Sequence, residues 1–195
     1  MDRQAEVTRE TRETRISVGI NLDGRGQHDI ATGVPFLDHM LAQVAVHGLL
    51  DLSVAAQGDV EVDDHHTVED TGITLGQALR QALGACTGLT RYGSATIPMD
   101  EALALVVVDL SGRSFLAYEA PFPQETIGRF NAQLVEEFLR ALVTHAQITL
   151  HVRLLAGRNS HHCAEAIFKA LGRALAQAIA PDSRRGGVPS SKGVL

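Results

Sequence analysis

The chain contains no tryptophan, only 4 % aromatic residues and two cysteines among its 195 residues. Two cysteines are too few for a disulfide framework, so the fold has to be stabilised by a core. Because 45 % of the residues are hydrophobic, we expect that core to consist mainly of Ala, Val, Leu and Ile. A chain of this length fits one large domain or two small ones.

Positive charge and long apolar runs are also scarce. The net charge of −6 argues against a nucleic acid bound by bulk charge. No apolar run approaches the roughly 20 residues that a transmembrane helix needs. The charged segment 1–15 lacks the apolar core of a signal peptide. We therefore expect a cytoplasmic protein with neither a nucleic-acid nor a membrane partner.

A short histidine motif occurs twice. The segment 65–69, His-His-Thr-Val-Glu, reappears at 161–165 as His-His-Cys-Ala-Glu. If each motif begins a helix, its first His and its Glu lie one turn apart, whereas the second His points about 100° away. Imidazole and carboxylate together suit Mn, Fe, Zn or Ni, with a slight preference for Mn. The motifs predict two metal ions, each bound by both halves of the chain; the alternative is a pair of solvated helix N-termini.

Hydrophobic periodicity predicts the secondary structure. Strands are expected at 15–22, 50–56, 103–110, 115–120 and 148–154, and helices at 35–46, 69–83, 130–144 and 162–180. We expect 115–120 to pair with 103–110 as a hairpin. The segment 84–93 is predicted to be a connector, and the tail from Pro181 a loop or flexible arm.

The two halves of the chain align with each other. Segment 36–41 lies over 134–139, His47 falls on His145, and the two histidine motifs coincide after a short gap. This pattern predicts a single domain of two pseudo-symmetric repeats, about 1–90 and 91–195. The fold class is α+β, with a strand-strand-helix-strand-helix unit duplicated and its sheets packed on helices.

Other polar residues are weaker candidates. His39 lies among apolar neighbours on a predicted helix, but its duplicate position carries Glu137, which can also bind a metal. Asp63 and Asp64 either orient the imidazoles or form a polar turn. Cys163 is expected to face the interior as a small hydrophobic residue. The candidates for binding an anionic group are Arg91, Arg113, Lys169 and Lys192.

Several segments together resemble the imidazoleglycerol-phosphate dehydratase family over essentially the whole chain. They are 21–24, 36–41, 63–70, 159–162 and 189–195. The family dehydrates imidazoleglycerol phosphate to imidazole acetol phosphate in histidine biosynthesis and uses two Mn ions. The resemblance implies a fold like the second domain of ribosomal protein S5. It also implies a homo-oligomeric shell of about 24 subunits with its active sites between subunits.

The resemblance also implies roles for individual residues. The metal ligands are His39, His65, His66, Glu69, Glu137, His161, His162 and Glu165. Family members carry histidine where Glu137 stands, so this Glu either coordinates with a shifted geometry or leaves one metal with fewer ligands. The substrate-binding residues are Glu13, His39, Gln43, His47, Arg91, Arg113, Lys169, Ser191 and Lys192, of which the basic ones hold the phosphate. Glu13, His65 and His161 are the expected catalytic residues.

This chemistry explains why two metals are needed. The proton that leaves the glycerol chain is not next to a carbonyl, so the imidazole ring has to store the electrons. Two metals on its nitrogens favour imidazolate, which expels the neighbouring hydroxyl, while Glu13 acts as acid and base. The rival interpretations are a dimetal phosphoester hydrolase and a metal-storage protein, the latter leaving Arg91, Arg113 and the Ser-Lys tail without a role.

Overall fold

The computed structural model describes residues 3–193, so Val194 and Leu195 of the C-terminal motif lie outside the described residues. The first half contains β1 (Gln4–Glu10), β2 (Thr14–Asn21), β3 (His28–Ala31), α1 (Pro35–Gly48), β4 (Asp51–Gly58) and α2 (His65–Leu83). The second half contains β5 (Tyr92–Met99), β6 (Ala102–Asp109), β7 (Phe115–Glu119), β8 (Thr126–Ile127), β9 (Phe130–Asn131), α3 (Gln133–Ala146), β10 (Thr149–Ala156) and α4 (Ser160–Ile179).

Both halves have the same topology. The first sheet has the strand order β1-β2-β4-β3 and the second has the order β5-β6-β10-β7. In each sheet the first three strands are antiparallel and the last pair is parallel. The predicted α+β fold with a duplicated unit is therefore confirmed. Within residues 3–193, no helix is long and apolar enough to span a membrane.

One predicted strand pairing is wrong. The segment 115–120 does not form a hairpin with 103–110; β7 instead pairs in parallel with β10. Both edges of β6 are already occupied, by β5 and by β10, so β7 joins the sheet beyond β10. The predicted connector 84–93 likewise ends in the first residues of β5. Strand β1 escaped detection because it lies at a sheet edge, where every second residue is exposed and polar.

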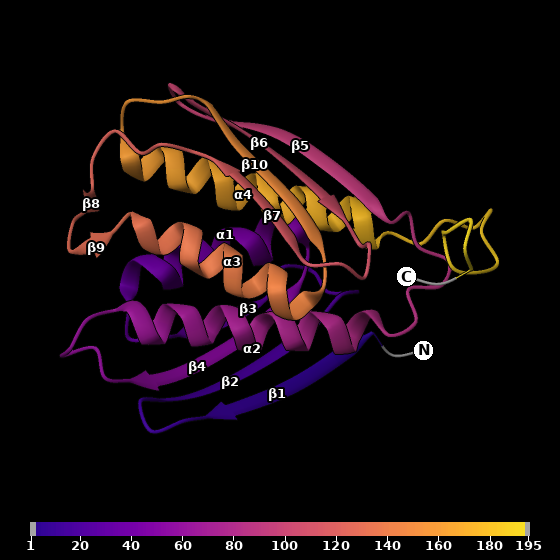
Figure 1. The fold of residues 1–195 in the computed structure, drawn as a ribbon, viewed down its shortest axis with the longest axis horizontal. Coiled ribbons are helices and arrows are strands. Elements are labelled where there is room, and N and C mark those ends of the chain that lie inside the picture. Colours follow the sequence, from indigo (N-terminus) through magenta and orange to yellow (C-terminus); the bar gives the residue numbers. More distant parts are fainter. Residues whose placement is uncertain (1–2, 194–195) are drawn as a thin grey trace.

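The four long helices lie between the two sheets (Figure 1). Helix α1 packs against α4, and α2 packs against α3, so each helix pair joins the two repeats. At the centre, the rings of Phe138 and Phe168 have their centroids 5.6 Å apart, and both side chains are fully buried. The other buried hydrophobic residues are almost all Ala, Val, Leu and Ile, as the composition predicts.

Glycines allow each helix pair to approach closely. A Cβ added at Gly172 of α4 would lie 2.8 Å from the carbonyl oxygen of Val44 in α1. The equivalent Gly76 of α2 faces α3 in the same way, with a Cβ 2.7 Å from the carbonyl oxygen of Leu142. The two crossings are thus repeated features of the duplication, and they fix how the side chains of paired helices meet.

Candidate metal centre

A cluster of ligand-type side chains lies where α1 meets the start of α4. Glu165 Oε2 is 3.3 Å from His39 Nε2 and 3.2 Å from His161 Nε2. One donor atom from each of these residues lies within 4.8 Å of the others. His161 and Glu165 are one turn apart on α4, because the motif lies in the first turns of that helix. The cluster therefore combines side chains from both repeats.

Polar side chains continue from this cluster along the same helix pair. Gln43 Nε2 on α1 is 3.5 Å from His39 Nδ1, and Lys169 Nζ on α4 is 2.8 Å from Glu165 Oε1. Burial opposes ionisation of Glu165, but the hydrogen bonds from Lys169 and His39 outweigh it and lower the pKa of the carboxyl. Burial and then the charge of Lys169 lower the pKa of the His47 imidazole. Six predicted site residues are thus brought together.

A second group occupies the equivalent place on α2 and α3. His65 Nε2 is 3.9 Å from Glu69 Oε2, and Glu137 and His65 line one cavity of about 500 Å³. Glu137 therefore stands where His39 stands in the first cluster. Most of the polar continuation is missing here: Ala141 takes the place of Gln43 and Ile73 that of Lys169, although His145 takes the place of His47. The two helix pairs have diverged, and the α1–α4 pair carries the substrate-type side chains.

The second histidine of each motif points away from its cluster. The rings of His65 and His66 are inclined at 85°, and those of His161 and His162 at 86°. His66 Nδ1 is 3.0 Å from Asp59 Oδ2, and this hydrogen bond raises the pKa of His66. Glu13 Oε2 lies further away, 3.8 Å from His66 Nδ1.

In the second repeat, His162 Nδ1 is 2.8 Å from Glu101 Oε2. The hydrogen bond from His162 lowers the pKa of Glu101 to about 2.

Sequence reasoning missed the carboxylates that contact these imidazoles. Asp63 and Asp64 were the candidates, but Asp63 accepts the backbone N–H of His65, and among the described residues neither carboxylate hydrogen-bonds to an imidazole. The duplication could have identified Glu101 as a candidate, because Glu101 directly precedes β6 just as Glu13 directly precedes β2. Asp59 gives no comparable signal. Cys163 is fully buried, as predicted.

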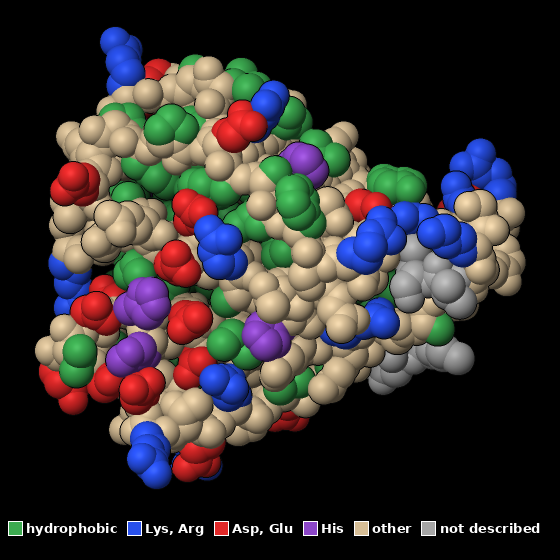
Figure 2. Space-filling model, viewed as in Figure 1, with side chains coloured by type: hydrophobic (Ala, Val, Ile, Leu, Met, Phe, Trp, Pro, Cys, Tyr) green, Lys and Arg blue, Asp and Glu red, His purple; other side chains and the backbone are tan. Residues whose placement is uncertain are grey.

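Of the basic residues predicted to hold the phosphate, Lys169 lies beside Glu165 in the first cluster, whereas Arg91, Arg113 and Lys192 lie elsewhere. Arg91 Nε donates to Asp109 Oδ1 at 2.7 Å, and Arg91 Nη1 donates to the carbonyl oxygen of Pro189, just before Ser191 and Lys192. This segment follows the C-terminal end of α4, a helix of 20 residues that spans about 30 Å. Figure 2 shows Lys and Arg side chains there, and histidine and acidic side chains toward the start of α2.

Arg113 belongs to the same end of the molecule. Arg113 lies in the loop after β6. Leu110, the first residue after β6, donates its backbone N–H to the carbonyl oxygen of Arg91. Within the described part of one chain, therefore, Arg91, Arg113, Ser191 and Lys192 do not meet the histidine clusters.

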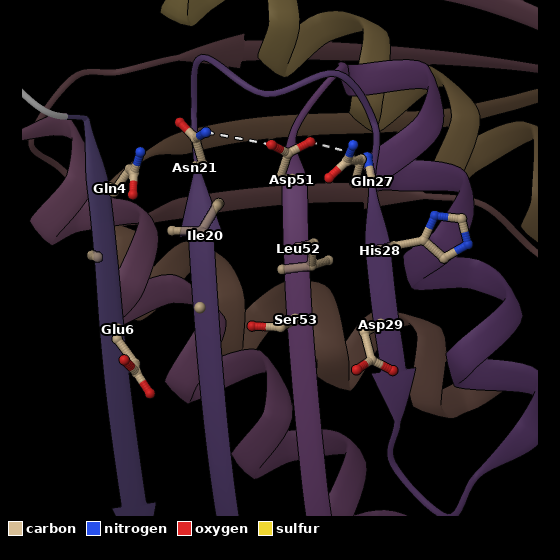
Figure 3. Close-up of a pocket in the computed structure, with 12 residues that line it drawn as sticks. Gln4, Glu6, Ile20, Asn21, Gln27, His28, Asp29, Asp51, Leu52 and Ser53 are labelled. Carbon is tan, nitrogen blue, oxygen red and sulfur yellow. Dashed lines mark hydrogen bonds between the residues drawn. The ribbon is translucent and has the colours of Figure 1, made fainter.

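A groove of about 700 Å³ crosses the outer face of the first sheet, with the helices on the other side (Figure 3). Its central Asp51 accepts backbone N–H groups from Arg25 at 2.8 Å and Gln27 at 3.0 Å, so this carboxylate ties down the loop before β3. The groove contains none of the predicted site residues. The imidazole and carboxylate clusters thus lie at the helix pairs and not in this groove.

Known proteins resemble this chain throughout its length. A family model described as imidazoleglycerol-phosphate dehydratase matches residues 32–175. A relative of that name from Moorella thermoacetica is 57 % identical over 195 residues, covering 100 % of both chains. One from Laribacter hongkongensis is 58 % identical over 194 residues, covering 99 % of this chain and 98 % of the relative.

Solved structures of the same name agree. The crystal structure from Staphylococcus aureus has a TM-score of 0.83 and 43 % identity, covering 91 % of this chain and 99 % of that one. The structure from Pyrococcus furiosus has a TM-score of 0.84 and 39 % identity, covering 97 % and 100 %.

The fold and these similarities define an enzyme of the hydro-lyase class, which removes water from its substrate. The chain belongs to the imidazoleglycerol-phosphate dehydratase family and acts in histidine biosynthesis. The activity predicted from the sequence motifs is confirmed, and the phosphoester hydrolase interpretation is not favoured.

Proposed function

We propose that the enzyme acts with two Mn²⁺ ions, bound by the imidazoles and carboxylates of the duplicated motifs. The observation that carries the proposal is the cluster of His39, His161 and Glu165, whose donor atoms lie within 4.8 Å of one another. Two imidazoles and a carboxylate fit a first-row divalent cation. His65, Glu69 and Glu137 form the equivalent set on the other helix pair.

The remaining ligands are His66 and His162, which point away from the cluster of their own motif. They are placed to complete sites other than the ones their neighbours form. When bound, the cations supply positive charge that favours loss of a proton from an imidazole in contact with them. The polar residues Gln43, His47 and Lys169 lie beside the first cluster and are suited to orient a polar substrate.

Glu13 is proposed to be the acid and base. Its side chain is 55 % exposed and lies near His66 without a short hydrogen bond to it, so it is free to accept and return a proton. The phosphate of the substrate is assigned to the basic residues Arg91, Arg113, Lys169 and Lys192, with Ser191 beside them, because cationic and hydroxyl groups suit that anion.

A complete site requires more than one copy of the chain. Apart from Lys169, the proposed phosphate-binding residues lie beyond the far end of α4 from His161, about 30 Å along the helix. The substrate is far smaller than this span. A homo-oligomer, proposed to be a shell of about 24 subunits, brings one chain's clusters to another chain's basic residues.

The experiment follows ketone formation from imidazoleglycerol phosphate by metal-stripped enzyme before and after Mn²⁺ is restored. Turnover that returns only with Mn²⁺ supports the metal assignment, and turnover without any added cation refutes it. The Glu13→Gln variant is expected to lose a factor of about 10²–10⁴ in turnover with its Mn²⁺ content unchanged. The control is Glu10→Gln. Glu10 is the last residue of β1, next to the loop that contains Glu13, and its side chain is 68 % exposed.

A further inference from the structure

The two histidines that point away from their clusters, His66 and His162, are each held by a carboxylate at Nδ1. Asp59 Oδ2 is 3.0 Å from His66 Nδ1, and Glu101 Oε2 is 2.8 Å from His162 Nδ1. A neutral imidazole has one N–H, so a carboxylate that accepts a hydrogen bond from Nδ1–H keeps the proton on Nδ1 and leaves the Nε2 lone pair free for a metal. The same arrangement occurs in both repeats, although the carboxylates come from different loops.

Asp59 and Glu101 are not duplicates of each other. Asp59 is the residue directly after β4, whereas Glu101 is the residue directly before β6. The residue equivalent to Asp59 in the second repeat is Gly157, directly after β10. A Cβ at Gly157 would lie 2.3 Å from the Sγ of Cys163, so no side chain fits there. The second repeat therefore has to obtain its carboxylate from another loop.

Glu101 is built into that loop. Its Oε1 accepts the backbone N–H groups of Arg158 at 3.1 Å and Asn159 at 2.8 Å, while Oε2 holds His162. Asn159 in turn caps α4 by accepting the backbone N–H of His161. One carboxylate thus fixes both the start of α4 and the orientation of the imidazole. Its side chain is 27 % exposed, against 55 % for Glu13.

Glu13, the duplicate of Glu101, is in a different situation. Asp59 already occupies Nδ1 of His66, and Glu13 Oε2 remains 3.8 Å away. We propose that Asp59 and Glu101 are positioning residues that orient the metal-binding imidazoles of His66 and His162, and that Asp59 thereby releases Glu13 for proton transfer. This inference rests on the proposed function, in which both imidazoles bind metal.

The test measures Mn²⁺ binding by calorimetry on the assembled, metal-stripped enzyme. The variants Asp59→Asn and Glu101→Gln are expected to weaken one class of Mn²⁺ site by about 10–100-fold. The matched control is Asp100→Asn, because Asp100 is next to Glu101 and its carboxylate is 4.0 Å from His162 Nε2, with the side chain 74 % exposed. Its Mn²⁺ affinity is expected to equal that of the wild type.

Two further readouts separate positioning from a general loss of structure. The visible absorption of the Co²⁺-substituted enzyme is expected to change in Asp59→Asn and Glu101→Gln, while the melting temperature in chelator stays near the wild-type value. Gln at 101 keeps an oxygen that can accept the backbone N–H groups. Among the described residues the Asp59 carboxylate accepts no backbone N–H, so Asp59→Asn tests the idea even if Glu101→Gln fails to fold.

Turnover distinguishes these residues from Glu13. In Glu101→Gln, turnover is expected to recover at saturating Mn²⁺, whereas in Glu13→Gln it stays low. Wild-type Mn²⁺ affinity in both Asp59→Asn and Glu101→Gln overturns the inference and leaves the proposed function standing. Failure of the wild-type enzyme itself to bind Mn²⁺ overturns the proposed function, and the inference falls with it.

Discussion

Replacement of Gly172 by alanine tests whether the close approach of α1 and α4 builds the first cluster. The added Cβ would lie 2.8 Å from Val44 O, 2.9 Å from Gly48 N and 3.3 Å from the carbonyl carbon of His47. All three are backbone atoms of α1, which cannot rotate away as a side chain would, so the helices have to separate. Overpacking of this kind costs about 1–3 kcal/mol.

The helix propensity of alanine opposes this cost. Alanine in place of glycine stabilises a helix interior by about 1 kcal/mol. Because the clash is with rigid backbone, we take the upper end of the packing cost, which leaves a net loss of about 2 kcal/mol. For a chain of this size each kcal/mol lowers the melting temperature by about 2–4 °C, so we expect a decrease of about 4–8 °C in chelator.

The same displacement moves His39 on α1 away from His161 and Glu165 on α4, so Gly172→Ala is also expected to weaken Mn²⁺ binding. The assays are thermal melts of the metal-free enzyme and calorimetric Mn²⁺ titration. The control is Arg173→Ala at the adjacent exposed position, which is expected to change stability by less than about 0.5 kcal/mol. A Gly172→Ala enzyme as stable as the wild type, with unchanged Mn²⁺ affinity, would refute the reasoning.

Four other outcomes are expected. Phe168→Ala removes a fully buried ring and should cost about 3–5 kcal/mol in urea unfolding; a loss below about 1 kcal/mol contradicts the central role of that ring. Glu137→His should keep or tighten Mn²⁺ binding by calorimetry, because it restores the residue that matches His39; abolished binding argues against a ligand at this position. Chelator should lower the melting temperature of the holoenzyme, and added Mn²⁺ should restore it. Backbone hydrogen bonds, of which that from Arg25 has the largest effect, lower the folded-state pKa of Asp51. The ionised carboxylate therefore stabilises the fold above its unfolded pKa of about 3.9, and this stabilisation is lost as the pH falls through the lower folded value. Asp51→Asn should therefore reduce the loss of stability below about pH 4, measured as urea midpoints, and an unchanged pH profile would show that the carboxylate is not stabilised in this way.

Local patterns in the sequence predicted the parts of the site that depend on one helix. The spacing of His161 and Glu165 places both on one face of α4 because an α-helix has 3.6 residues per turn. The alignment of the halves predicted the repeated unit, and the equivalence of His39 and Glu137 followed from it. The motif at 65–69 begins α2, although periodicity alone placed the start of that helix at 69.

Non-local contacts were out of reach of the same reasoning. The pairing of β7 with β10 rather than β6 depends on which strand edges remain free once the sheet has formed. Glu101 meets His162 across 61 residues of sequence, and no periodicity connects them. Asp59 is closer in sequence to His66, but it was indistinguishable from the neighbouring acidic residues Asp63 and Asp64.

The sequence by itself determined the duplication, the helices that carry the candidate ligands and the chemical type of each side chain, because these follow from periodicity and residue identity. The tertiary structure decided which helices pair, which carboxylate contacts each imidazole and which helix pair carries the polar side chains. Those choices depend on packing between distant segments, as at Gly172, where the absence of a side chain lets α1 and α4 bring His39 to Glu165.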